Sequence, residues 1–187
     1  MKEKILVWSL TVVLLAAAWG VSKATLTDDA ATAPFPTVAA LDEPVAARNL
    51  AATVTDVHVA TRVTDAEGWT AEGTWLVVDL TAATVVTQQS ATLRLAELVI
   101  GDRTFTATDR GTTLVGQRLF TGVPRSGSIA FELPADALTG SGVLRLGVPS
   151  EASPNDVPLD GVIELTVRLD ELPVEVDAAL DENGWAR

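Results

Sequence analysis

The sequence contains no cysteine, no tyrosine and a single histidine, His58, among its 187 residues. Without cysteine the chain cannot form disulfides or thiolate metal sites. A Ser–His–Asp triad would have to use His58, and the Gly-x-Ser-x-Gly motif of serine hydrolases is absent. One histidine also leaves only carboxylates as further ligands for a catalytic zinc ion. We therefore expect a solvated surface histidine, no catalytic residue, no cofactor and no metal site, and a protein that is not an enzyme.

Basic and aromatic residues are scarce as well. The 13 Lys and Arg residues stand against 25 Asp and Glu, which gives a formal net charge of −12. A surface of this sign repels phosphate backbones, so nucleic acid is excluded as a partner. Because aromatic residues make up only 5% of the chain, Val, Leu, Ile, Ala and Thr must build the core. Val and Thr favour strands, and 9 Pro with 13 Gly supply turns, so the composition predicts an all-β domain.

The one long apolar run, Ile5–Val21, lies at the N-terminus and follows Lys2 and Lys4. A run of this length can just cross a bilayer whose hydrocarbon core is about 30 Å thick. Basic flanking residues stay on the cytoplasmic side of a membrane. We expect residues 1–4 in the cytoplasm, a transmembrane signal-anchor over residues 5–22 and the rest of the chain outside. The protein would then be a single-pass protein of the cell membrane.

A cleavable signal peptide is the alternative interpretation of the same run. Ser22 and Ala24 offer small residues at the −3 and −1 positions of a cleavage site. The apolar run is longer than the usual hydrophobic region of about 7–15 residues, and Lys23 lies beside the cut, which favours the anchor. Under both interpretations, the part of the chain after the apolar run is exported.

A shorter apolar run organises the rest of the sequence. Thr74–Leu80 reads Thr-Trp-Leu-Val-Val-Asp-Leu, which is too short for a membrane span and typical of a central strand covered on both faces. Further alternating strands surround it within residues 49–170, the expected sandwich domain. Residues 23–48, rich in Ala, Pro and Asp, are expected to form an extracytoplasmic linker, and residues 171–187 an acidic C-terminal tail.

Local signals predict how some of these strands are connected. Residues 100–103, Ile-Gly-Asp-Arg, are typical of a two-residue hairpin. The apolar alternation changes phase between residues 93–95 and residues 96–100, which indicates a β-bulge or a change of sheet. About seven strands at this spacing favour an immunoglobulin-like antiparallel β-sandwich preceded by one N-terminal transmembrane helix. A closed barrel is the alternative.

The strand that begins near Thr53 shows the clearest alternation. Val57 and Val63 are expected on one face of this strand, and Asp56 and His58 on the other. This placement is the reason for expecting His58 in solvent.

Two stretches resemble a known family. Gly73–Thr81 is similar to the "G-x-W-hydrophobic-V-V-D-hydrophobic-T" strand of a bacterial secreted immunoglobulin-like family. That family includes lipoproteins, membrane-anchored proteins and mycobacterial secreted antigens, and is sometimes filed under a misleading telomere-repeat-binding label. Pro124–Pro134 resembles its later segment, a Pro/Gly turn followed by an alternating strand that ends in proline.

The resemblance covers about residues 50–170. It departs from the family pattern after Leu80, where Ala82–Val86 stands in place of an Asn-rich turn. The function of the family is largely unknown. The resemblance therefore implies a fold and an extracytoplasmic location, and it implies nothing catalytic.

The segment of residues 109–125 is the longest loop-like stretch and the expected recognition surface. It places Leu119 and Phe120 near Arg118 and Arg125, and apolar anchors rimmed by arginine are frequent in protein interfaces. The alternative is that residues 114–120 form another strand in which Leu119 or Phe120 is buried.

Other candidates have simpler interpretations. Trp75 is expected in the core, and Trp69 and Trp185 are expected to pack locally, with a role as partner anchors as the alternative for both. The acidic residues 151–160 could offer oxygen ligands to calcium, but they lack the alternating ligand spacing of an EF-hand loop. We expect a solvated acidic turn there.

These expectations combine into a hypothesis of function. The chain would be a membrane-anchored, extracytoplasmic and non-enzymatic β-sandwich that binds another protein of the bacterial cell envelope or acts as an accessory envelope subunit. The alternative is a secreted module, with its signal peptide cleaved, that binds a small ligand or a polysaccharide. A protein-binding role predicts an exposed apolar patch, and a ligand-binding role predicts a concave pocket with converging polar groups.

Overall fold

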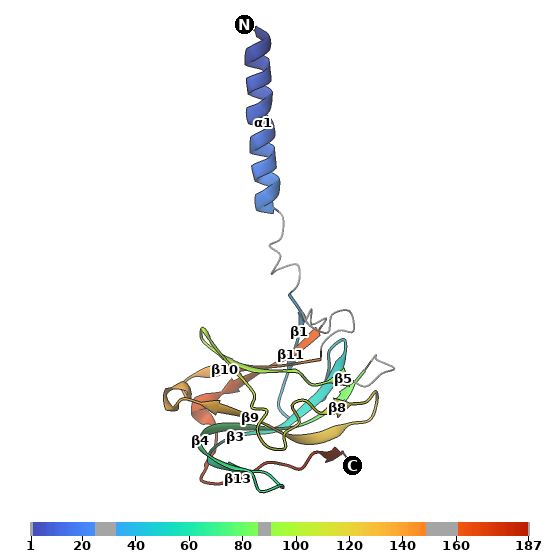
Figure 1. Ribbon diagram of the computed structural model, residues 1–187, viewed down its shortest axis with the longest axis vertical. Helices are drawn as coiled ribbons and strands as arrows, with labels where there is room; N and C mark the ends of the chain where they lie inside the picture. The colour runs from blue at the N-terminus through green and yellow to red at the C-terminus, as the bar shows by residue number, and fades with distance from the viewer. Residues whose placement is uncertain (1, 25–32, 86–90, 149–160, 187) are drawn as a thin grey trace. The chain divides into compact units, whose positions relative to one another are not determined.

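The computed structural model describes residues 2–24, 33–85, 91–148 and 161–186 (Figure 1). The chain divides into two compact units, Met1–Ala33 and Pro34–Arg187. The first unit contains one helix. The second contains all of the strands.

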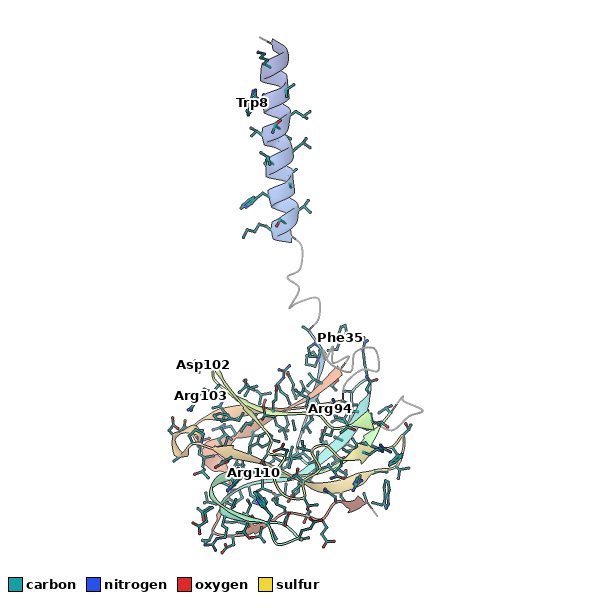
Figure 2. All side chains as sticks on the ribbon, viewed as in Figure 1. Trp8, Phe35, Arg94, Asp102, Arg103 and Arg110 are labelled. Carbon is teal, nitrogen blue, oxygen red and sulfur yellow. The ribbon has the colours of Figure 1, made fainter. Side chains whose placement is uncertain are left out.

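The N-terminal helix α1 (Lys2–Ala24) confirms the predicted helical segment. The large apolar side chains that the structure describes between Val7 and Val21 are exposed, among them Trp8, which Figure 2 labels, and Trp19, at 71% and 68% exposure. In the part of the chain that the structure describes, no helix combines the length and the apolar character needed to cross a membrane. The helix is confirmed, and its role as a transmembrane anchor stays a prediction.

The second unit is a β-sandwich, as predicted. One sheet has the order β1-β11-β10-β6-β7, the other has the order β12-β3-β4-β9-β14 with β2 and β13 attached to β3, and β5 pairs with β8. The strands are β1 (Phe35–Ala39), β2 (Val45–Ala46), β3 (Leu50–Thr64), β4 (Thr70–Thr84), β5 (Ala91–Thr92), β6 (Leu95–Ile100), β7 (Arg103–Thr106), β8 (Arg118–Leu119), β9 (Arg125–Leu133), β10 (Ser141–Gly147), β11 (Gly161–Arg168), β12 (Val174–Glu175), β13 (Ala178–Ala179) and β14 (Gly184–Trp185). Two short 3-10 helices, η1 (Ala135–Ala137) and η2 (Leu169–Glu171), follow β9 and β11.

Strand β4 is the central strand that its apolar run predicts. It lies between β3 and β9, and both of its faces are covered. Leu76, Val78 and Leu80 point into the main core between the sheets. Trp75 and Val77, also fully buried, point to the opposite side. A continuous run of apolar residues is required because successive side chains of a strand face opposite ways.

Two of the predicted connections are confirmed. Strands β6 and β7 form the two-residue hairpin, with Ile100 paired to Arg103 and Gly101 at a φ of 60°. A positive φ costs glycine little because it has no Cβ. The change of phase near residue 95 is a change of sheet, since β5 pairs with β8 whereas β6 pairs with β10.

The N-terminal boundary of the sandwich lies earlier than predicted. Residues 23–48 were expected to form a linker, but β1 pairs in parallel with β11 and β2 pairs with β3. Pro36 is tolerated because β1 is the edge strand of its sheet. The Arg48 guanidinium stacks over the Phe35 ring at 4.1 Å, which fastens this segment further. The unit begins at Pro34.

The predicted acidic tail, residues 171–187, is also part of the sandwich. The C-terminal segment (residues 174–186) runs parallel to β3 through β12 and β13, then pairs antiparallel with β9 through β14 (Figure 1). These parallel pairings and that of β1 are departures from the expected antiparallel sandwich. The β-sandwich is confirmed, and its immunoglobulin-like character stays a prediction.

The C-terminal segment covers the outer face of the β3-β4-β9 sheet. There Ala178 and Leu180 pack with side chains from the sheet in a second apolar cluster, here called the outer cluster: Ala60, Val63, Trp75, Val77, Ala130, Ala178 and Leu180. Val63 was expected on the same face as Val57, but the register of β3 and β4 shifts between Ala60 and Arg62. This irregularity turns Val63 into the outer cluster.

Candidate functional site

A register shift in β3 creates the first group of polar side chains. Val54 pairs with Leu80 and Asp56 pairs with Asp79, so Thr55 is an extra residue in β3. With this bulge Val54 and Val57 both reach the main core, although they are three residues apart. Asp56 and His58 are left on the outer face, beside Asp79.

His58 is buried rather than solvated, which corrects the expectation from sequence. The residue is 7% exposed, and its Nδ1 lies 2.8 Å from Oδ2 of Asp56. Two neighbours on β3 follow the predicted alternation, since Val57 and Val59 enter the main core. His58 does face away from that core, but this face is not open to solvent.

Two further hydrogen bonds connect Asp79 through Ser128 to the C-terminal segment. The Ser128 hydroxyl donates to Oδ1 of Asp79 and accepts the backbone N–H of Asp181 at 2.7 Å. Ser128 is fully buried. Burial raises the pKa of Asp79, and the negative charges of Asp181 and Asp56 act in the same direction, while the Ser128 hydrogen bond and His58 oppose the rise.

The arrangement of this group differs from a Ser–His–Asp triad. In a Ser–His–Asp triad the imidazole accepts the proton of the serine. Here the Ser128 hydroxyl is engaged with Asp79, and His58 Nδ1 is engaged with Asp56. The ligand atoms of Asp56, His58 and Asp79 lie within 4.8 Å of one another, so the group has the donor types of a metal site. We call these three residues the His58 cluster.

The second candidate is a pair of exposed aromatic rings. Phe120 follows β8 and Trp185 lies in β14, and their ring centroids are 5.7 Å apart. The guanidinium of Arg125, which pairs with Trp185 in the register of β9 and β14, lies 5.8 Å from the Trp185 ring. Phe120, Val123 and Trp185 are 39%, 45% and 57% exposed. We call these residues, with Arg125, the aromatic patch.

The structure divides the four residues expected to bind a partner. Phe120 and Arg125 meet at Trp185 in the aromatic patch. Leu119 is fully buried in the main core, so its side chain cannot contact a partner, and this part of the expectation is wrong. Arg118 is exposed and pairs with Thr92 between β8 and β5. Leu119 is buried because β8 alternates one exposed and one buried residue.

The three tryptophans of the sandwich also differ in exposure, since Trp69 and Trp75 pack against each other whereas Trp185 is exposed. Trp69 packs edge-on against Trp75, with centroids 6.0 Å apart, as local packing predicts. The Arg110 guanidinium, labelled in Figure 2, lies 5.9 Å and 5.4 Å from these two rings and pairs with Glu132. Trp185, for which local packing was also expected, is more than half exposed.

Asp65 orders the turn beside Trp69. Its carboxylate accepts the backbone N–H groups of Glu67 and Trp69 on one oxygen and that of Thr112 on the other. Desolvation by burial acts to raise the pKa of Asp65, but these backbone hydrogen bonds outweigh it and hold the pKa below its usual value.

A groove lined mainly by residues of β1, β11 and the turns that follow them has the size of a small-molecule site. Its volume is about 440 Å³. It is mostly apolar, with Arg168 and Glu171, which are paired at 2.7 Å, among its lining residues. The full lining is Val38, Ala39, Ala40, Leu41, Val57, Leu165, Thr166, Val167, Arg168, Glu171 and Leu172. The acidic turn at residues 151–160 lies outside the described residues.

The comparisons with known proteins add no evidence about function. No family model matches the chain, and the search of curated proteins finds no match. Among solved structures, the chain is similar to an uncharacterized β-sandwich protein from Clostridium difficile 630. The sequence identity is 7%, the match covers 73% of this chain and 97% of that chain, and the TM-score is 0.45. This similarity carries no argument about function.

The sequence contains part of the signal for both sites. Asp56 and His58 are visible as neighbours on one face of a strand, and Phe120 and Arg125 as members of one segment. Their partners come from elsewhere: Asp79 and Ser128 from β4 and β9, and Trp185 from β14. Only the sheet register brings these residues together.

Proposed function

We propose that this chain is a non-enzymatic binding protein of the cell envelope whose sandwich docks on another envelope protein through the aromatic patch. One observation carries the proposal: Phe120 and Trp185, 65 positions apart in the sequence, contact each other while 39% and 57% of their surfaces stay exposed. Aromatic side chains of this kind are the commonest energetic anchors of protein interfaces.

The charge around the patch supports the same role. Arg125 stacks on Trp185 on a chain whose net charge is −12. Arginine next to aromatic anchors is enriched at interface centres, because its planar guanidinium stacks and also binds carboxylates. The expected partner is therefore an envelope protein that offers an apolar pocket with acidic groups at its rim.

Site-specific photo-crosslinking in cells tests this proposal. A photo-reactive residue at position 185 of the full-length chain should give a defined crosslinked product with one partner. The matched control carries the same residue at Val176, which is 71% exposed and lies on the same C-terminal segment outside the patch. Phe120→Ala should remove the product formed at position 185.

The stability of the variant separates docking from folding. The contact with Trp185 contributes about 0.5–1.5 kcal/mol beyond the area that the rings bury. Because Phe120 is also 39% exposed, Phe120→Ala should lower the free energy of unfolding by less than the roughly 3–5 kcal/mol of a core Phe→Ala change. Equal crosslinking from positions 185 and 176, or none from either, would contradict the proposal. A loss of several kcal/mol in Phe120→Ala would show that the ring belongs to the core.

We also propose that α1 anchors the sandwich in the membrane, with the N-terminus cytoplasmic and the sandwich outside. The support is the apolar run Ile5–Val21 with Lys2 and Lys4 before it. The full-length protein should stay in the membrane pellet after carbonate washing and should keep its native N-terminus. A soluble product that begins at Thr25 would replace the anchor by a cleaved signal peptide.

A second candidate function is the binding of a small ligand or polysaccharide in the 440 Å³ groove between β1 and the end of β11. The groove has the size and the apolar lining of small-molecule sites, with a polar pair to orient a ligand. Leu172→Arg would fill the groove, whose lining includes no residue of the aromatic patch. Loss of ligand binding in this variant, with crosslinking at position 185 unchanged, would favour the second function.

A further inference from the structure

We propose that Asp56, His58 and Asp79 bind a divalent transition-metal ion, with Zn²⁺ as the best fit, on the outer face of the sandwich. The three side chains offer one imidazole nitrogen and two carboxylate oxygens from neighbouring positions of β3 and β4. This donor set is one that proteins use for zinc.

The spacing of the ligand atoms fits a small coordination sphere. The candidate atoms all lie within 4.8 Å of one another, and Nδ1 of His58 is 2.8 Å from Oδ2 of Asp56. Zinc–nitrogen and zinc–oxygen bonds of about 2.0–2.2 Å place tetrahedral ligands about 3.3 Å apart. A bound metal ion would take the place of the proton between His58 and Asp56, and this proton would be released to solvent. The Asp56 side chain is 55% exposed and can rotate to complete the geometry.

The backbone is built to bring these ligands together. If the register of β3 and β4 continued regularly from the pair Val54–Leu80, Thr55 rather than Asp56 would lie opposite Asp79. The bulge therefore selects a carboxylate for this place, and Thr55 fastens it by donating its hydroxyl hydrogen bond to the backbone carbonyl of Asp79 at 3.0 Å. Bulges of this kind are frequent where a strand re-aims side chains for a site.

Hydrogen bonds through Ser128 orient the Asp79 carboxylate. The Ser128 hydroxyl donates to Oδ1 of Asp79, and the backbone N–H of Asp181 donates to the Ser128 oxygen. Oδ2 of Asp79 is left for a metal ion. Hydrogen bonds of this type orient metal-binding carboxylates and are costly to remove. His58 is pre-oriented as well, since its side chain is 9% exposed.

The charge balance of the group calls for a cation. The two carboxylates of the cluster lie within 4.8 Å of each other and share a single imidazole. A divalent ion neutralises both carboxylates at once. The imidazole selects Zn²⁺ over hard cations such as Ca²⁺, which prefer oxygen ligands alone.

The test uses the fact that the chain contains a single histidine. In the full-length, untagged, ¹⁵N-labelled protein, every imidazole signal in a ¹H–¹⁵N spectrum belongs to His58. On addition of ZnCl₂ the imidazole nitrogen signals should shift and reach a saturated position, because the imidazole becomes a metal ligand. CaCl₂ at the same concentration should leave them unchanged.

Substitutions identify the other ligands. Asp56→Asn and Asp79→Asn should each weaken the Zn²⁺ affinity read from the His58 signals by more than tenfold, and Ser128→Ala should weaken it by about 10- to 100-fold, as removal of a group that orients a ligand does. Asp102→Asn, at the exposed tip of the β6-β7 hairpin and labelled in Figure 2, is the matched control and should bind as the native chain does.

Two results would overturn the proposal. In the first, the His58 signals do not move at millimolar Zn²⁺, which reduces the cluster to a buried hydrogen-bonded pair. In the second, they move equally in the native chain and in Asp56→Asn, which places the metal on the imidazole alone. Asp56 is exposed, so this variant keeps its fold and the test stays decisive even if Asp79→Asn unfolds.

Discussion

The two faces of the sheet formed by β3, β4 and β9 are built in different ways. The inner face is packed by the opposite sheet and is almost wholly apolar. The outer face is covered by the C-terminal segment and mixes a small apolar cluster with buried Ser128 and His58. Both candidate sites lie on or beside this outer face. The comparison suggests that the inner face determines the fold and the outer face carries the chemistry.

The largest expected effect lies on the inner face. Leu76 is fully buried in the main core, where the opposite sheet prevents its surroundings from collapsing. Leu76→Ala should lower the free energy of unfolding in the upper part of the range of about 2–5 kcal/mol, as measured by urea denaturation. A loss below about 1 kcal/mol would contradict the assignment of this face.

A smaller effect is expected for the matching leucine of the outer face. Leu180 is 4% exposed, but it lies on the C-terminal segment, which can move towards the sheet when the side chain is shortened. Leu180→Ala should therefore cost about 2 kcal/mol, the low end of the range for buried leucine. If the two variants lose equal free energy in the same urea series, the outer face is packed as rigidly as the inner one.

Gly127 sharpens the comparison because its closest contact joins β9 to the C-terminal segment. A Cβ at this position would lie 2.2 Å from Oδ1 of Asn183, whose Nδ2 donates to the carbonyl of Thr113 at 2.7 Å. Gly127→Ala should displace Asn183 and cost about 1 kcal/mol, roughly the value of one hydrogen bond. In NMR spectra, shifts should concentrate in residues 181–186. Widespread shifts in the main core would contradict this view.

The smallest expected effects are on the pH dependence of stability, and their signs differ for two carboxylates. The pKa of Asp65 is lowered in the folded protein, so its carboxylate contributes to the free energy of unfolding at pH values above the usual aspartate pKa. This contribution is lost as the pH falls through the folded-state pKa. The raised pKa of Asp79 means that its ionisation costs stability as the pH rises from the usual value through the folded-state pKa.

Urea titrations across this acidic range separate the two contributions. The stability deficit of Asp65→Asn relative to the native chain should shrink as the pH falls. Asp79→Asn should gain stability relative to the native chain as the pH rises. Difference curves that stay flat for both variants would show that neither carboxylate has a perturbed pKa in the folded protein.

The sequence predicts the inner face well because its signals are local. The apolar run of β4, the hairpin at residues 100–103 and the change of sheet near residue 95 are each encoded within a few neighbouring residues. Binary patterning of this kind depends only on which neighbours alternate.

The outer face could not be predicted in this way. Strands β12, β13 and β14 have two residues each, which is too few to show an alternation. His58 looks solvated because the C-terminal segment, which packs on this face of the sheet, follows more than a hundred residues later in the chain. The contact between Phe120 and Trp185 could not be predicted for the same reason, because no residue near either of them in the sequence indicates the pairing of β9 with β14.

Amide hydrogen exchange along the C-terminal segment tests the central claim most directly, because this segment completes both the aromatic patch and the surroundings of the His58 cluster. The backbone N–H groups of Leu180, Asp181 and Ala186 donate to Thr64, Ser128 and Pro124. Their exchange in the full-length protein should be slower by about 100-fold or more than in an unstructured peptide, as in other hydrogen-bonded sheet edges. Exchange of all three at the peptide rate would show that residues 174–186 form a free tail, and it would contradict the account of the outer face.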